Sequence, residues 1–242
     1  MAGMRRRTLL HRLALGAVST AAIPGWASAA SDHSAVLAAA DVHRGAARRG
    51  VSWTLTITPP RGAPEALFVQ TRGGDFLAEY LSPARANGQR ILRRGRNMWF
   101  VDPDALLVRP VTPREHLLGS AALGDIASDR WTSDYSVADA QSEGNLLVFT
   151  LVARSRQATY DKVILTVDRT TGTAVNIEMR TPVDDTVLKT ALMQYRDAAF
   201  DGKIIRQISI SRGGEITSLV YSDVEFGPLA PSVFLPENAL AA

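Results

Sequence analysis

Hydrophobic and polar residues alternate without interruption over residues 51–58, where Val51, Trp53, Leu55 and Ile57 are separated by serine and threonine. A period of two predicts a β-strand that buries one of its faces. Segments of similar composition follow along the rest of the chain, separated by turns that contain glycine or aspartate. The strands expected after 51–58 are 66–71, 76–82, 89–93, 97–101, 106–109, 136–141, 145–153, 162–168, 174–180, 186–194, 203–211 and 216–226.

The period is helical in an alanine-rich segment that precedes the first strand. Residues 34–49 carry apolar side chains at helical spacing, between an N-cap, Asp32, and a stop, Gly50. A second helix start lies at Thr112, followed by Pro113 at the first helical position and Glu115 in the place that closes a capping box. These signals predict an N-terminal helix and a short lid-like helix, with a further small-residue turn of helix behind the lid.

Together these elements predict one mainly β domain of the α+β class. We expect a single antiparallel, half-open β-barrel of about ten or eleven strands, wrapped around the N-terminal helix and carrying the short lid helix. The chain shows no internal repeat, no low-complexity linker and no change in composition that would divide it into two domains.

The N-terminus has the features of an export signal. Basic residues Arg5–Arg7 precede a short apolar stretch, and Ala27-Ser28-Ala29 forms a small-residue cleavage site. We therefore expect residues 1–29 to be removed, which leaves a domain of residues 30–242. The order of Arg6-Arg7-Thr8-Leu9-Leu10 is similar to a twin-arginine signal, and an ordinary Sec signal remains the alternative.

Charge and cysteine content narrow the possible functions. Arg5, Arg6, Arg7 and Arg12 leave with the signal peptide, which reduces the 27 basic residues to 23 against 24 acidic ones. A nearly neutral mature chain lacks the electrostatic basis for binding nucleic acid. The chain has no cysteine, so we expect neither a disulfide nor an N-terminal lipid anchor. A local cluster of arginines at 90–96 is compatible with a solvated turn or with an anionic partner.

A search for catalytic chemistry finds no convincing arrangement. The domain contains only His33, His43 and His116, and it has no H-E-x-x-H motif, nucleophile elbow, P-loop or dinucleotide fingerprint. The adjacent carboxylates Asp184 and Asp185 follow a proline and read as a β-turn. We therefore expect no enzyme activity, no cofactor and no metal.

Short motifs between residues 98 and 127 carry a resemblance to a known family. They are MWF (98–100), VRP (108–110), TPR (112–114), LLG (117–119) and GDIA (124–127). In this order they resemble the LolA-like outer-membrane lipoprotein-sorting proteins, whose half-barrel fold is shared by LolA, LolB and RseB. The resemblance implies a soluble periplasmic carrier that hides acyl chains in a hydrophobic cavity between sheet and helices.

Candidate site residues follow from the apolar runs on several strands. Consecutive apolar residues, as at 98–101 and 146–149, indicate burial on both faces, either in an ordinary core or against a cavity. The resemblance favours a cavity. The expected lining residues are Trp53, Phe68, Phe76, Tyr80, Trp99, Phe149, Ile177 and Met179. The resemblance also implies that Arg72 at a strand end helps to gate the cavity, together with Leu117 and Leu118 of the lid.

The expected function is transfer of lipoproteins or lipids toward the outer membrane. Exposing an acyl chain to water costs about 0.8 kcal/mol per CH₂, so a carrier must enclose it. We expect acyl chains as ligand, an inner-membrane exporter as donor, transient contact with a membrane and a monomeric state. The alternative is a periplasmic module of the same fold that senses lipids or lipoproteins. The sequence leaves open whether the cargo is a lipoprotein or a free lipid.

Overall fold

A computed structural model describes residues 25–45, 50–127, 130–198 and 202–240. Most of the expected signal peptide, residues 1–24, lies outside the described residues. The expected cleavage site Ala27-Ser28-Ala29 lies within helix α1 (Gly25–His43). None of the described helices is long and apolar enough to cross a membrane.

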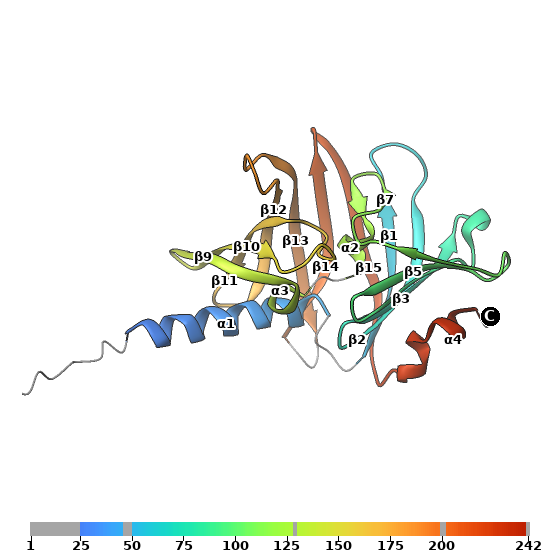
Figure 1. Cartoon of the computed structure of the whole chain (residues 1–242), viewed down its shortest axis with the longest axis horizontal. Coiled ribbons are helices and arrows are strands. Elements are labelled where there is room, and N and C mark those ends of the chain that lie inside the picture. Colours follow the sequence, from blue (N-terminus) through green and yellow to red (C-terminus); the bar gives the residue numbers. More distant parts are fainter. Residues whose placement is uncertain (1–24, 46–49, 128–129, 199–201, 241–242) are drawn as a thin grey trace, which may run out of the picture.

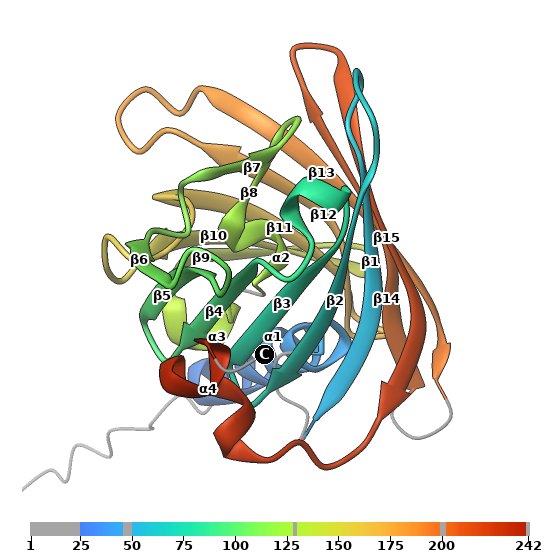
Figure 2. The ribbon, with the colours of Figure 1, turned by 90° about the vertical axis from the view of Figure 1, so that its right-hand side faces the viewer.

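One antiparallel sheet dominates the described part of the chain (Figures 1 and 2). In spatial order its strands are β6 (Leu107–Val111), β5 (Asn97–Asp102), β4 (Arg90–Arg94), β3 (Asp75–Ser82), β2 (Glu65–Arg72), β1 (Val51–Thr58), β15 (Glu215–Phe226), β14 (Gly202–Arg212), β13 (Val187–Ala198), β12 (Thr173–Arg180), β11 (Lys162–Asp168), β10 (Leu146–Ala153) and β9 (Tyr135–Glu143). Edge strands β6 and β9 are not paired with each other, so the curved sheet stays open.

This arrangement confirms a mainly β chain with a large, open antiparallel sheet. Every segment expected to be a strand contributes to it, but the expected total of about ten or eleven was too low. The sheet has thirteen strands, and a separate hairpin is formed by β7 (His116–Leu118) and β8 (Ala121–Ala122). The pairing of β1 with β15 joins the first and last strands in the middle of the sheet.

Alternation along the strands produces one continuous apolar face. In β1 the four buried residues Val51, Trp53, Leu55 and Ile57 point to the concave side, and the residues between them are partly exposed. Similar alternation in β3, β10, β11 and β14 extends this face across much of the sheet. The resulting core is a single cluster that also takes in apolar residues of the helices.

Helix α1 covers only part of the concave face. It contacts β11, β12, β14 and the short helix α3 (Trp131–Asp134), so the expectation that the whole sheet wraps around it is not confirmed. The helix also ends earlier than expected. Gly45 has a φ of +88°, and a Cβ there would lie 3.0 Å from the Trp53 ring, so Gly45 and not Gly50 terminates the helix.

Asp41 fixes α1 to α3. Its carboxylate accepts hydrogen bonds from the backbone N–H of Trp131 (2.7 Å) and from the N–H and hydroxyl of Thr132 (3.2 and 2.6 Å). Burial raises the pKa of Asp41, and the hydrogen bonds from Thr132 and Trp131 counteract that rise. The contact joins two elements that are 90 residues apart in the chain.

The expected lid helix over 113–118 is wrong. Residues Thr112–Glu115 form a turn in which the Glu115 N–H donates to the Thr112 carbonyl (3.1 Å) and the Thr112 N–H donates to the Glu115 carboxylate (2.8 Å). The chain then enters β7, and Leu123 N–H donates to the Glu115 carbonyl (2.9 Å), which holds the hairpin together. The small-residue turn of helix expected behind it exists as α2 (Leu123–Ile126).

The C-terminal segment covers part of the convex face. A 3-10 helix, η2 (Pro231–Phe234), and helix α4 (Pro236–Leu240) lie outside β3–β5 (Figure 1). Fully buried Phe234 packs there with Leu92, Val101 and Trp99. The run of apolar residues at 98–101 is therefore buried on both faces of the sheet, as its composition predicted, and a protein segment provides the second cover.

We predict that Gly124→Ala destabilises the β8–α2 segment. A Cβ on Gly124 would lie 1.8 Å from Thr159 Oγ1 and 2.8 Å from Thr159 Cβ, so the two segments must separate. Overpacking of this kind costs about 1–3 kcal/mol of unfolding free energy. The matched control is Gly227→Ala, where nothing lies within 4 Å of the new Cβ. Urea unfolding of both variants checks the prediction, and equal stability of the two variants would contradict it.

Candidate ligand-binding site

The sequence-predicted cavity residues lie on both faces of the sheet. Trp53, Phe76, Tyr80, Phe149, Ile177 and Met179 are buried in the concave core cluster. Phe68 is 39% exposed and pairs with Thr54, so it lies on the convex face opposite Trp53. Trp99 packs under Phe234 on the same convex face. Phe68 and Trp99 therefore do not belong to one lining group with the other six.

A small cavity remains in the C-terminal half of the concave core. Its volume is about 20 Å³, room for about one water molecule. Apolar residues from β12, β13 and β14 form most of its wall, and Arg44, Gly124, Asp125, Trp131 and Tyr160 complete it. Of the six concave residues predicted from the sequence, Ile177 and Met179 line this cavity, and the other four lie in the packed core around it.

Buried aromatic groups show how apolar this interior is. Burial raises the pKa of Tyr80 to about 12, and it also raises the pKa of Tyr195 and of Tyr221. The indole N–H groups of Trp53 and Trp131 are buried without a hydrogen-bond partner among the described residues. An unpaired buried donor costs about 1–3 kcal/mol, so both positions favour a ligand or water that supplies an acceptor.

The cavity is closed by the segment that runs from β7 through α2, residues 116–126, which we call the cover segment. Figure 2 shows it inside the curve of the sheet. Leu123 and Ile126 pack into the core cluster, and Leu117 and Leu118 are partly buried against it. Leu117 and Leu118, which we expected to gate the cavity, therefore lie against the concave core, in a hairpin and not in a helix.

A buried ion pair attaches the cover segment to the sheet. Lys189 Nζ on β13 lies 2.7 Å from Asp125 Oδ2 and donates to the Ser120 carbonyl (2.8 Å). The Tyr160 hydroxyl donates to Asp125 Oδ1 (2.7 Å), and the Ala122 N–H donates to Asp125 Oδ2 (2.8 Å). Since Lys189 and Asp125 are 8% and 7% exposed, this contact is shielded from solvent.

A second cation lies beneath the same segment. The Arg44 guanidinium lies 4.9 Å from the centre of the Trp131 ring and 3.5 Å from the Asp125 carbonyl oxygen. Gly119, with a φ of +59°, completes the fit on the other side because a Cβ there would lie 2.3 Å from Thr217 Oγ1. The glycines of the cover segment therefore permit close approach between it and the neighbouring segments.

Arg72, predicted from the resemblance to gate the cavity, lies at the β2–β3 turn opposite Asp75. It is partly exposed, and it does not line the cavity. Arg93 instead donates to the carbonyl of Ala127 (3.3 Å), the residue that follows the cover segment, and to the Asp134 carboxylate of α3 (3.2 Å). The sequence contained one indication of the ion pair that we did not use. Lys189 lies two residues before Ala191 and four before Met193, so strand alternation places its side chain on the same buried face.

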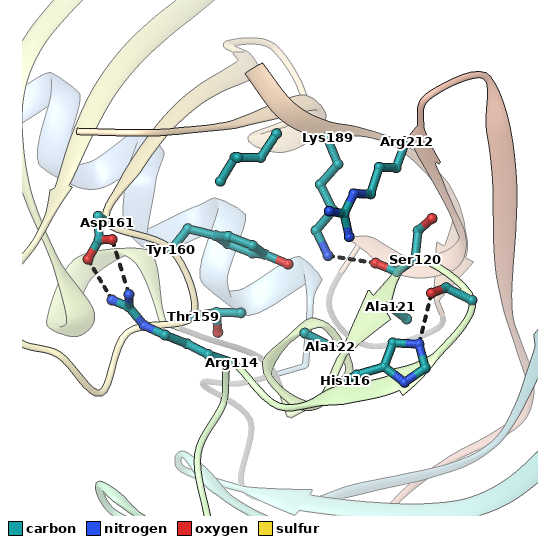
Figure 3. A pocket seen from close by; sticks show the side chains of 12 residues that line it. Arg114, His116, Ser120, Ala121, Ala122, Thr159, Tyr160, Asp161, Lys189 and Arg212 are labelled. Atoms are coloured by element: carbon teal, nitrogen blue, oxygen red, sulfur yellow. Dashed lines mark hydrogen bonds and ion pairs between the residues drawn. The ribbon is translucent and has the colours of Figure 1, made fainter. Parts of the chain in front are cut away.

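An outer pocket of about 300 Å³ opens between the cover segment, the loop at 159–161 and strands β13 and β14 (Figure 3). Arg114 donates to both oxygens of Asp161 (3.0 and 2.6 Å), and this interaction lowers the pKa of the Asp161 carboxyl. Lys189 and Arg212 enter the pocket from the opposite wall. No group of three or more His, Cys, Asp or Glu that could hold a metal occurs within the described ranges.

The open antiparallel sheet with its partly covered concave face is similar in fold to solved LolA-like structures. A LolA superfamily protein from Nitrosomonas europaea matches with a TM-score of 0.71 and 24% identity, covering 84% of this chain and 97% of that one. A putative outer membrane lipoprotein-sorting protein domain from Vibrio parahaemolyticus gives a TM-score of 0.69 at 14% identity, covering 86% and 98%. The LolA-like resemblance read from the sequence is thus confirmed at the level of the fold.

A third structure, a DUF1329 family protein from Desulfovibrio piger, has a TM-score of 0.68 at 14% identity, covering 86% of this chain and 98% of that one. Residues 73–240 match the model of a family described as "Uncharacterized protein", and the chain belongs to that family. A comparison with curated proteins found no match.

We predict strong coupling between Lys189 and Asp125. Lys189→Met leaves a buried carboxylate without its cation and should lower the unfolding free energy by about 3 kcal/mol. In the double variant Lys189→Met/Asp125→Asn neither charge remains, so much of this loss should be recovered. Urea unfolding of the wild type, of Lys189→Met, of Asp125→Asn and of the double variant gives the coupling energy.

The matched control is the surface pair Lys203–Asp197, with a similar separation of 2.6 Å but side chains that are 36% and 88% exposed. Its coupling should stay within about 1 kcal/mol. Similar coupling energies for the buried and surface pairs would show that the buried contact does not attach the cover segment.

Proposed function

We propose that this protein is a non-catalytic carrier that binds acyl chains of lipoproteins or lipids on the concave face of its sheet. The supporting observation is how that face is covered. Over the cavity it is closed by the short cover segment, which is held by a buried ion pair and a few hydrogen bonds. Removing the segment would expose the apolar side chains of β12, β13 and β14 beneath it as a trough, while the hydrogen bonds between the sheet strands stay intact.

The closed form has no room for cargo. A cavity of about 20 Å³ is far too small for an acyl chain, so loading requires the cover segment to move. Each CH₂ removed from water gains about 0.8 kcal/mol, so a chain of ordinary length can replace the contacts of Leu117, Leu118, Leu123 and Ile126. Loss of cargo then favours closure, because the empty trough would expose the same apolar surface.

The place of action that we propose is the periplasm, after removal of residues 1–29. A carrier there would receive its cargo from an inner-membrane exporter and make transient contact with the acceptor membrane. The LolA-like fold and the export signal in the sequence support this placement. The second candidate function is a sensory module of the same fold, in which cargo binding would change the contacts of the cover segment without transfer of the cargo to a membrane.

Tryptophans on the two opposite faces of the sheet allow a direct test of lipid binding. Trp53 and Trp131 are buried in the concave core, whereas Trp99 lies on the convex face. A phospholipid with brominated acyl chains should quench the fluorescence of the mature protein with saturation near one lipid per protein. Quenching should persist in Trp99→Phe and should fall strongly in a Trp53→Phe/Trp131→Phe variant.

Brominated and unbrominated lipids of the same class serve as the matched pair of probes, and circular dichroism confirms that each variant is folded. Quenching that depends on Trp99 and not on Trp53 and Trp131 would place the lipid on the convex face and contradict the proposal. Absence of quenching in the folded wild type would contradict acyl binding altogether.

A further inference from the structure

We propose that the outer pocket binds the phosphate-bearing head of an anionic lipid, with Arg212 and Lys189 as its main ligands. This inference rests on the proposed function, because the acyl chain of that lipid would occupy the concave trough behind the pocket. The geometry on which it depends is the convergence of these two cations beside the ion pair that attaches the cover segment (Figure 3).

The lining of the pocket is basic. Three side chains, Arg114, Lys189 and Arg212, carry a positive charge, and Asp161 carries the one negative charge in the lining. Asp161 accepts hydrogen bonds from both terminal nitrogens of the Arg114 guanidinium. Arg212 is exposed and forms no ion pair with any residue in the described ranges. The positive charge of the lining that is not already paired therefore comes from Arg212, because Lys189 is held by Asp125.

Strand alternation aims Arg212 into the pocket. Ile208 and Ile210 of β14 line the inner cavity, and Arg212 is the next residue of the same parity. It thus continues the concave face of β14 at the point where that face leaves the core and reaches the surface. A lipid whose head group is bound by Arg212 can therefore place its acyl chain along Ile210 and Ile208.

Only a thin polar wall separates the pocket from the inner cavity. Tyr160 lines both spaces, and the Lys189–Asp125 pair lies beside it. Lys189 has one ammonium group, which now serves Asp125 and the Ser120 carbonyl. A phosphate in the pocket offers several charged oxygens, so it can take over Lys189 while Asp125 keeps its bonds from Tyr160 and Ala122.

Recognition of the head would in this way loosen the attachment of the cover segment. The apolar part of the pocket suits the atoms next to the phosphate, because the Tyr160 ring and Leu188 border the two cations. The inference therefore assigns a ligand class, an acyl lipid with a phosphate head, and it connects head binding to access of the chain.

Isothermal titration calorimetry with three probes tests the assignment. The probes are lysophosphatidic acid, a monoacylglycerol with the same acyl chain and glycerol 3-phosphate, each below its critical micelle concentration. Arg212→Gln is compared with Arg206→Gln, because Arg206 is an exposed arginine on the same strand that does not line the pocket. Circular dichroism confirms that both variants keep the wild-type fold.

Wild-type protein should bind lysophosphatidic acid about tenfold more tightly than the monoacylglycerol, as a charge-assisted hydrogen bond predicts. Arg212→Gln should remove most of that preference and leave monoacylglycerol binding unchanged, while Arg206→Gln should behave as wild type. Equal affinity of the wild type for both lipids would overturn the head-group site and leave the carrier function intact.

A different pattern would overturn the carrier function. If glycerol 3-phosphate binds with a dependence on Arg212 while neither acyl lipid binds, the pocket recognises a free phosphate ester, and both the lipid assignment and the proposed carrier are wrong. Equal losses of lysophosphatidic acid affinity in Arg212→Gln and Arg206→Gln would show only general electrostatic attraction and would also overturn the site.

Discussion

The burial of one continuous apolar face controls the whole structure. Most of the thirteen strands place large apolar side chains on the concave side, and the sheet does not close on itself to hide them. Closure of the sheet would cover this face permanently, whereas here α1, α3 and the segment at 116–126 cover it. Because the cover consists of separate segments, an acyl chain can replace one of them on the apolar face, and this is the physical basis of the proposed carrier.

The polar contacts around Lys189 determine where such an exchange would begin. A buried ion pair contributes little net stability compared with a well-packed apolar contact, but the loss of one partner is costly. An ion pair of this kind can hold the cover segment in one position in the closed form, and a competing charge can replace one of its partners. The Lys189–Asp125 pair lies between the small cavity and the outer pocket. Separation of the two side chains would therefore change both the access to the interior and the charge of the pocket.

The sequence predicted most of the fold because strand alternation is a local property. The strict pattern of 51–58 and the motifs at 98–127 were sufficient to predict the open sheet and the LolA-like resemblance. The helix at 113–118 failed because Thr112 and Glu115 can close a turn with the hydrogen bonds that also start a helix. The contact of Lys189 with Asp125 spans 64 residues, and no local pattern reports such a pair. For Trp99, the apolar run predicted burial on both faces but not that Phe234 would provide the second cover.

Hydrogen exchange over the cover segment, residues 116–126, with and without a bound phospholipid tests the central claim most directly. The amides of Leu123 and Gly124 donate to carbonyls at Glu115 and Pro113 in the closed form, and loading should expose them to faster exchange. Amides in the β11–β12 pair serve as the internal reference, because the sheet should remain unchanged. Faster exchange confined to the cover segment is the result that we predict. Unchanged protection at 116–126 in protein that demonstrably contains lipid would contradict the account, because the cargo would then lie elsewhere.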